Sequence, residues 1–182
     1  MTANRNRVRI IGGKWRSRLL RFPPAAQLRP TPDRVRETLF NWLGQRLDGL
    51  ECLDLFAGSG ALGFEALSRG AARAVMVDSD RAVADALREN VKALEAAGAE
   101  IVQRDAMAYL DGAADRFDVA FVDAPFASGL AHQAMERLPR RLKPGARVYV
   151  ESAQPLDLGT PWAVLREDRA GAVRYALYEL TP

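Results

Sequence analysis

An apolar run passes directly into a glycine turn in the stretch Cys52-Leu53-Asp54-Leu55-Phe56-Ala57-Gly58-Ser59-Gly60. Residues 52–56 have the length and apolar character of a buried strand, and residues 61–69 read as a helix. Glycines between a strand and a helix are typical of a tight connection. The stretch therefore predicts the first strand and helix of an α/β sheet.

Strand-like and helix-like segments alternate after this first unit. Further strands are predicted at 74–78, 101–103, 117–122 and 147–151, and further helices at 81–97 and 129–138. This alternation favours a mostly parallel sheet with helices on both faces. Two more strand-like runs, 162–167 and 172–180, predict an antiparallel hairpin at the end of a seven-stranded sheet.

The N-terminal residues predict a small β-hairpin followed by a linker. Two short apolar runs, 8–11 and 18–20, flank Gly12-Gly13, which is a strong turn signal. We therefore expect residues 1–30 to form a hairpin and linker, and residues 31–182 to form the main domain.

A helix is predicted to follow the linker. Thr31 suits the N-cap and Pro32 the first helical position. Val35, Leu39 and Leu43 then recur at helical spacing, so we expect that face to be buried.

Positive charge is concentrated near the N-terminus. The first 46 residues hold eleven lysines and arginines against two acids, a charge of +9, whereas the remainder carries −6. A basic arm on a mildly acidic body favours a polyanionic partner.

The composition excludes several classes of protein. The single cysteine, Cys52, leaves no disulfide framework, and the single histidine, His132, leaves no His-based metal cluster or Ser-His-Asp triad. No apolar run approaches the roughly 20 residues of a membrane span, and the N-terminal residues lack the apolar stretch of a signal peptide. We therefore expect a cytoplasmic protein without a metal, whose chemistry depends on acids, backbone groups, aromatic rings or a cofactor.

The glycine turn is a candidate ligand site. Glycines let the backbone approach a ligand, and the following helix offers free N–H groups. A third glycine at dinucleotide spacing and a Gly-Lys-Ser/Thr sequence are both missing. Because Asp54 would repel a pyrophosphate and attract a cation, a small ligand with an ammonium or sulfonium group fits better. A purely structural turn is the alternative.

Acids also end the next two predicted strands. Asp78-Ser79 comes 18 residues after Gly60, where an acid can bind both ribose hydroxyls of a nucleoside. Asp105-Ala106 follows the third strand, where a carboxylate could accept a hydrogen bond from an adenine amino group. Each acid alone could be a solvated residue, but together with the glycine turn they describe a site for S-adenosylmethionine.

The tetrapeptide Asp123-Ala124-Pro125-Phe126 directly follows the apolar run 117–122. It places an acid, a rigid turn and an aromatic ring at the carboxyl end of a strand, which is where open α/β sheets bind ligands. Such a group suits stacking on a flat ring while an acceptor holds the amino group of that ring.

These motifs resemble the class I methyltransferases, whose amino-methylating tetrapeptide usually reads Asn/Asp/Ser-Pro-Pro-aromatic. Ala124 stands where the first proline is usual, which reduces the stiffness of the turn. The blocks Arg9-Ile10-Ile11-Gly12-Gly13-Lys14-Trp15-Arg16 and Ala57-Gly58-Ser59-Gly60-Ala61-Leu62-Gly63-Phe64-Glu65-Ala66-Leu67-Ser68-Arg69 further resemble the bacterial 16S rRNA guanine-N2 methyltransferases. The block from Leu28 to Leu43 is also similar, so the resemblance covers nearly the whole chain.

The resemblance implies a Rossmann-like class I methyltransferase fold. It also implies methyl transfer from S-adenosylmethionine to N2 of a guanine in 16S rRNA of the small ribosomal subunit. We expect a monomer in which Asp123 and the Pro125 carbonyl hold the amine and Phe126 stacks on the guanine. The expected cofactor-binding residues are Asp54, Ala57, Gly58, Ser59, Gly60, Asp78, Ser79, Asp105 and Ala106. The expected RNA-binding residues are Arg9, Lys14, Trp15, Arg16, Arg18, Arg29, Arg34 and Arg36, with Trp15 as a stacking platform.

Two alternatives stay open. The tetrapeptide type also serves methylation of adenine N6 in DNA and of glutamine N5 in proteins, although the compact size and the N-terminal blocks argue against both. A non-enzymatic ribosome-assembly factor with the same fold is the second alternative. The intact residues Gly58, Gly60, Asp78 and Asp123 argue against it.

Overall fold

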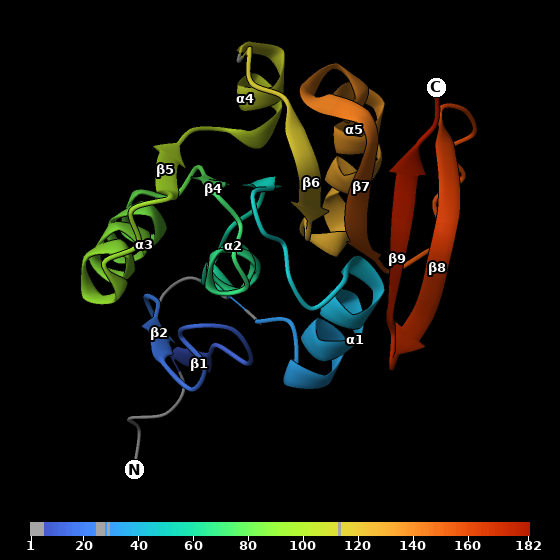
Figure 1. Ribbon diagram of the computed structural model, residues 1–182. Coiled ribbons are helices and arrows are strands. Elements are labelled where there is room, and N and C mark those ends of the chain that lie inside the picture. The colour runs from blue at the N-terminus through green and yellow to red at the C-terminus, as the bar shows by residue number, and fades with distance from the viewer. Residues whose placement is uncertain (1–5, 25–27, 29, 113) are drawn as a thin grey trace.

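The computed structural model describes residues 6–24, 28, 30–112 and 114–182. Figure 1 shows a central sheet with helices on both sides and a small N-terminal hairpin. The strands are β1 Arg7–Arg9, β2 Leu19–Arg21, β3 Glu51–Asp54, β4 Arg73–Asp78, β5 Ala99–Gln103, β6 Phe117–Val122, β7 Leu142–Ser152, β8 Trp162–Ala170 and β9 Val173–Leu180. The helices are α1 Asp33–Leu43, α2 Ala61–Ser68, α3 Arg81–Leu94, α4 Ala106–Gly112 and α5 Leu130–Arg137, with single 3-10 turns at Phe126–Ser128 and Leu138–Arg141.

The main sheet has the strand order β5-β4-β3-β6-β7-β9-β8. Neighbours from β5 to β7 pair in parallel, whereas β9 runs antiparallel to both β7 and β8. The predicted α/β fold, with its mostly parallel seven-stranded sheet and C-terminal antiparallel hairpin, is confirmed. The strand order reverses between β3 and β6, and open α/β sheets bind ligands at the carboxyl ends of the strands at such a switch point.

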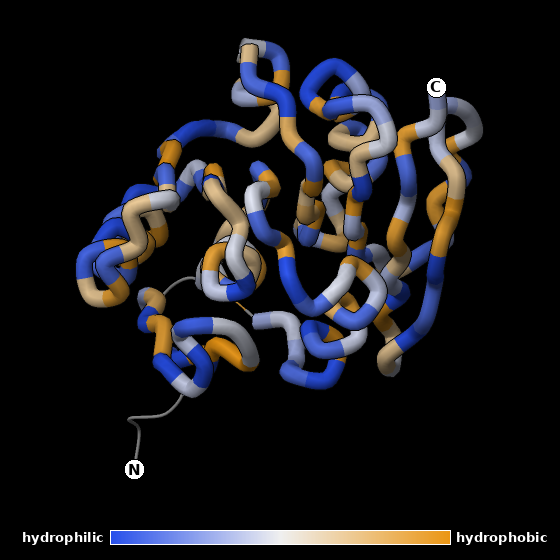
Figure 2. Tube along the Cα trace, in the orientation of Figure 1, coloured by the Kyte–Doolittle hydropathy of each residue, from blue (hydrophilic) through white to orange (hydrophobic). Residues whose placement is uncertain are grey.

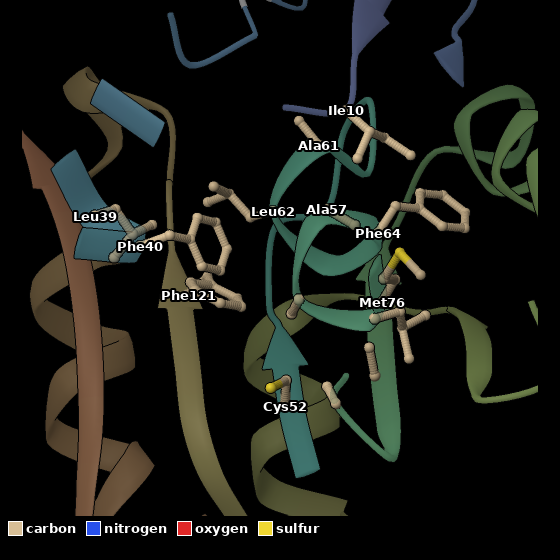
Figure 3. Packing of buried hydrophobic residues seen from close by; sticks show 14 of the residues in the cluster. Ile10, Leu39, Phe40, Cys52, Ala57, Ala61, Leu62, Phe64, Met76 and Phe121 are labelled. Atoms are coloured by element: carbon tan, nitrogen blue, oxygen red, sulfur yellow. The ribbon is translucent and has the colours of Figure 1, made fainter. Parts of the chain in front are cut away.

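Side chains alternate between the two faces of the sheet, as strand geometry requires. On β4, Met76 joins the cluster beneath α1, α2 and α3, while Val75 and Val77 join the cluster beneath α4 and α5. Figure 3 shows the first cluster, in which the rings of Phe40 and Phe121 lie 6.1 Å apart. In Figure 2 orange and tan segments alternate with blue ones along the strands as well as along the outer helices. Helices therefore cover both faces of the sheet, so a ligand can reach the strands only at their ends.

The predicted N-terminal hairpin is present, and its loop packs on α2. β1 and β2 pair antiparallel, and Ile10 and Leu20 are fully buried in the same cluster as α2. Lys14 N donates to the Ser68 carbonyl at 2.8 Å. Gly13 has a φ of +75°, and a Cβ there would lie 1.9 Å from the same carbonyl oxygen, so only glycine allows this approach. The division of the chain at residue 30 stays a prediction.

Two local predictions differ from the structure. Pro32, not Thr31, is the N-cap of α1, and no side chain caps this helix, because the Thr31 hydroxyl bonds to carboxyl groups on other elements. The helix α4 was not predicted. Asp105 begins it by accepting a hydrogen bond from Ala108 N at 2.9 Å. Within the described ranges, no helix combines the length and apolarity needed to cross a membrane.

Candidate active site

A cavity lies at the carboxyl ends of β3, β4 and β6, beside the switch point of the sheet, and has a volume of about 330 Å³. Its lining residues are Leu28, Pro30, Thr31, Asp54, Phe56, Ala57, Gly58, Ser59, Ala61, Leu62, Asp78, Asp123, Ala124, Pro125 and Phe126. The structure thus brings eight predicted site residues into one cavity. Sequence reasoning missed its apolar walls and Thr31.

Acids at the ends of two strands hold the glycine loop. Gly58 N donates to Asp78 Oδ2 at 3.0 Å, and Gly63 N donates to Asp54 Oδ2 at 3.0 Å. Gly60 has a φ of +77°, and a Cβ there would lie 2.6 Å from a side-chain carbon of α3. Glycine is therefore needed at this position, and the loop is fixed without a ligand.

Asp54 is a buried acid with no salt-bridge partner among the described residues. Burial raises the pKa of its carboxyl group to about 7, and the charge of Asp78 adds to the rise, while the bond from Gly63 opposes it. A positively charged ligand group nearby would favour the ionised carboxylate and lower this pKa again. The electrostatics therefore suit a cationic ligand.

Asp123 and Glu151 form a second acidic group at the ends of β6 and β7. Thr31 Oγ1 lies 3.3 Å from Asp123 Oδ2 and 2.8 Å from Glu151 Oε1. The Tyr149 hydroxyl donates to the same Glu151 oxygen at 2.9 Å. Burial, and then the charge of Glu151, raise the pKa of Asp123 well above its usual range, and burial also raises the pKa of Glu151. Sequence reasoning did not identify Glu151 or Tyr149.

The remaining residues of the tetrapeptide differ in whether their groups are free to contact a substrate. Phe126 borders the cavity and is 48% exposed, so its ring is accessible. The Pro125 carbonyl accepts hydrogen bonds from both the backbone N–H and the hydroxyl of Ser128. A carbonyl has two lone pairs, so none is left for the predicted contact with a substrate amine. The Ala124 carbonyl, which has no hydrogen-bond partner among the described residues, belongs to a residue that lines the cavity.

Four predicted cofactor-binding residues do not line the cavity: Gly60, Ser79, Asp105 and Ala106. Gly60 shapes the loop, and Ser79 is exposed between β4 and α3. Asp105 caps α4, and Ala106 is buried. In the described part of the chain, no group of three or more His, Cys, Asp or Glu side chains could hold a metal ion.

Part of the predicted RNA-binding arm is exposed. Arg9 pairs with Asp33 at 3.0 Å, and Arg18 donates to the Ala93 carbonyl at 2.8 Å, so both side chains are anchored yet accessible. The exposed members of the arm are Arg9, Lys14, Arg16, Arg18 and Arg34. Four of these five belong to the N-terminal hairpin and its loop.

Two other predicted RNA-binding residues are interior residues. Arg36 is fully buried, where it pairs with Asp33 at 2.6 Å and faces Glu65 at 3.5 Å. Trp15 is 8% exposed and packs in the core, so it offers no stacking platform. The prediction of RNA contact is therefore wrong for both residues, because the fold uses their side chains for packing. Arg29 lies outside the described residues.

Comparisons with known proteins identify the family of this chain. The family model described as conserved hypothetical protein 95 matches residues 8–179. Ribosomal RNA small subunit methyltransferase D of Escherichia coli (strain K12) is 46% identical, covering 94% of this chain and 89% of the relative. Its namesake from Haemophilus influenzae is 44% identical, covering 94% and 93%. The solved structure of the Escherichia coli protein YhhF, described as a candidate methyltransferase, has a TM-score of 0.88 and 45% identity and covers 96% of this chain and 98% of that chain. The chain therefore belongs to the conserved hypothetical protein 95 family, the family of these bacterial small-subunit rRNA methyltransferases.

Proposed function

We propose that the chain transfers a methyl group from S-adenosylmethionine to the exocyclic N2 of a guanine in 16S rRNA. The relatives are named as methyltransferases of small-subunit ribosomal RNA, which supports S-adenosylmethionine-dependent rRNA methylation. The observation that carries the finer assignment is one cavity that holds both the strand-end acids and the motif Asp123-Ala124-Pro125-Phe126. A ribosomal substrate also leads us to infer a cytoplasmic location.

The residues of the cavity fit S-adenosylmethionine. The carboxylate of Asp54 suits the positive charge of the ligand, and the carboxylate of Asp78, at the end of β4, suits ribose hydroxyls. Gly58 and Ser59 let the backbone approach the ligand closely. Phe56 and Leu62 supply apolar walls for the adenine ring. The cofactor supplies the methyl group on a sulfonium centre.

The tetrapeptide orients the substrate amine in this proposal. Asp123 accepts one N–H bond of the guanine amine, and the carbonyl of Ala124 takes the second, in place of the engaged Pro125 carbonyl. The nitrogen lone pair is then directed toward the methyl group, and such positioning lowers a barrier without a strong base. Phe126 stacks on a guanine that has left its helix, a contact worth roughly 1–3 kcal/mol.

The exposed basic residues provide the RNA contact in this proposal. Lys14, Arg16 and Arg18 lie on the loop between β1 and β2 of the hairpin, and all three are exposed. Phosphate contacts of this kind release counterions, so affinity for RNA should fall steeply with salt. A small basic surface offers little sequence readout, which favours the assembled or assembling small subunit as the substrate.

The decisive experiment incubates the protein with labelled S-adenosylmethionine and one of three acceptors: unmodified small subunits, free 16S rRNA or DNA. Label on N2 of one guanine in the small subunit supports the proposal. Label on adenine or on protein would establish one of the alternative methyltransferases instead. Cofactor binding without any transfer would favour an assembly factor.

A matched pair of variants tests the site itself. Asp123→Ala removes the acceptor side chain of the tetrapeptide, whereas Asp157→Ala makes the same change at an exposed position outside the cavity. We expect only Asp123→Ala to lower methyl transfer. Equal activity of the two variants would contradict the role of Asp123.

A further inference from the structure

Behind the tetrapeptide, two carboxyl groups share one hydroxyl. Thr31 Oγ1 lies within hydrogen-bond distance of Asp123 Oδ2, at 3.3 Å, and of Glu151 Oε1, at 2.8 Å. Glu151 is 5% exposed, and Tyr149 contacts its Oε1 at 2.9 Å. Thr31 precedes α1, Asp123 follows β6, and Glu151 lies on β7. The arrangement therefore connects the tetrapeptide to the buried end of β7.

The number of hydroxyl hydrogens available to Asp123 and Glu151 shows which of the two acids carries a proton. A threonine hydroxyl has one hydrogen, so it can donate to only one of the two carboxyl groups. The shorter distance gives that hydrogen to Glu151, which also receives the hydrogen of Tyr149. The contact with Asp123 is then favourable only if Asp123 carries a proton and donates it. The hydrogen bonds thus place the negative charge on Glu151 and the proton on Asp123.

The surroundings support one charge rather than two. Neither acid forms a salt bridge with a described lysine or arginine. The other titratable groups that face the pair are Asp54 from β3 and Tyr149 from β7, and Tyr175 from β9 lies behind Tyr149. None of these groups supplies a positive charge. Two buried carboxylates without a cation cannot both ionise cheaply, so the pair shares a proton.

We propose that Glu151 is a positioning residue and proton acceptor for methyl transfer, acting through Asp123. This inference rests on the proposed function of the site. Glu151 holds Asp123 as a neutral carboxyl group whose carbonyl oxygen is free to accept the N–H of the substrate amine. Thr31 fixes the orientation of both groups.

The reaction then balances in protons and in charge. The N2 lone pair forms the new N–C bond, and the electron pair of the broken C–S bond stays on sulfur. The nitrogen gives its proton to the carbonyl oxygen of Asp123, while Asp123 passes its own proton to Glu151. Before transfer, the sulfonium and Glu151 carry opposite charges, and afterwards both are neutral, while the protonation of Asp54 is unchanged. No net charge is created in the buried site.

The test compares the wild type with Glu151→Gln, Thr31→Val and the control Glu167→Gln, which removes an exposed carboxylate from β8. Carboxyl-carbon NMR of the cofactor-free protein measures the titration of Asp123, and the pH profile of kcat measures the reaction. In the wild type we expect a pKa of Asp123 well above its usual range and an acid limb of kcat in which activity rises as Glu151 ionises.

The two variants should change these profiles in different ways. Glu151→Gln removes a like charge, so it should lower the pKa of Asp123, abolish the acid limb that reports the ionisation of Glu151 and reduce kcat by at least about tenfold at unchanged KM. Thr31→Val removes a hydrogen bond that favours the ionised pair, so it should move the acid limb to higher pH. Thr31→Val also keeps the proposal testable if Glu151→Gln does not fold.

Several outcomes would overturn the inference. An ordinary pKa for Asp123 in the wild type would do so, as would a Glu151→Gln profile identical to that of Glu167→Gln. The proposed function fails separately, if the wild type labels no rRNA, and the titration of the cofactor-free protein still decides whether Asp123 and Glu151 form a pair.

Discussion

Replacing Glu65 by glutamine should destabilise the chain strongly, because Glu65 is a buried acid that holds four donors. Its Oε1 accepts hydrogen bonds from Gly12 N at 2.7 Å and Arg69 Nε at 2.9 Å. Its Oε2 accepts from Ile11 N at 2.9 Å and faces Arg36 Nη1 at 3.5 Å. A glutamine keeps one acceptor, while its NH2 group must face two donors.

The size of the effect follows from burial. The side chain of Glu65 is 0% exposed and that of its partner Arg69 is 5% exposed, so the substitution leaves the Arg69 charge without its buried carboxylate. Breaking such a buried pair costs about 3–5 kcal/mol, and we expect about 3 kcal/mol because Arg36 keeps its pair with Asp33. For a chain of this size, 3 kcal/mol corresponds to a drop in Tm of roughly 6–12 °C.

Urea unfolding of the cofactor-free protein measures this loss as a lower midpoint at unchanged m. Glu100→Gln is the matched control, because Glu100 also pairs with an arginine, Arg73, but its side chain is 50% exposed. The control should lose no more than about 1 kcal/mol. Equal losses for the two variants would refute the reasoning that burial makes the Glu65 network strong.

Three further predictions concern the cavity. Phe126→Ala should lower kcat/KM for the small subunit about 5- to 150-fold, which corresponds to about 1–3 kcal/mol of stacking. Calorimetry should find cofactor binding unchanged. A parallel loss of cofactor affinity would contradict the stacking role. The pKa of Asp54 is raised to about 7, above its value of about 3.9 in the unfolded chain, so the stability due to this group is lost as pH rises through about 7. Asp54→Asn should therefore flatten the fall in unfolding free energy between about pH 4 and 7, and an unchanged slope in a urea series would contradict this. Ala124→Pro should raise the unfolding free energy by about 0.4–1 kcal/mol, since the Ala124 N–H has no acceptor among the described residues. A lower urea midpoint would show that the turn does not accept the proline ring.

Much of the fold and the candidate site followed from local sequence patterns. The strand β6 begins and ends where it was predicted, because its apolar residues face helices on both sides of the sheet. Asp54, Asp78 and Asp123 were predicted to meet because parallel strands end at one edge of a sheet. This inference needs only that the strands run parallel, which the alternation of strands and helices indicates.

Long-range pairing was harder to predict. Arg36 read as part of a basic arm because its partner Glu65 lies 29 residues away and both charges look solvated in the sequence. A signal was present, since Arg36, Phe40 and Leu43 follow helical spacing and all three are buried. Glu151 had a similar signal: it lies two residues after Tyr149 on one face of β7, at the end of an apolar run.

The helix α2 connects the N-terminal hairpin with the glycine loop. All eight residues of α2 are buried, and Gly63 in its first turn bonds to Asp54, while Glu65 and Ser68 hold the hairpin loop. A short packed helix moves as one body, so the position of the hairpin and the position of Asp54 are set together. Glu65→Gln should therefore weaken cofactor binding, although no residue of β1 or β2 lines the cavity. Calorimetry at a temperature where the variant is fully folded measures this effect, and wild-type affinity there would show that the hairpin and the loop are independent.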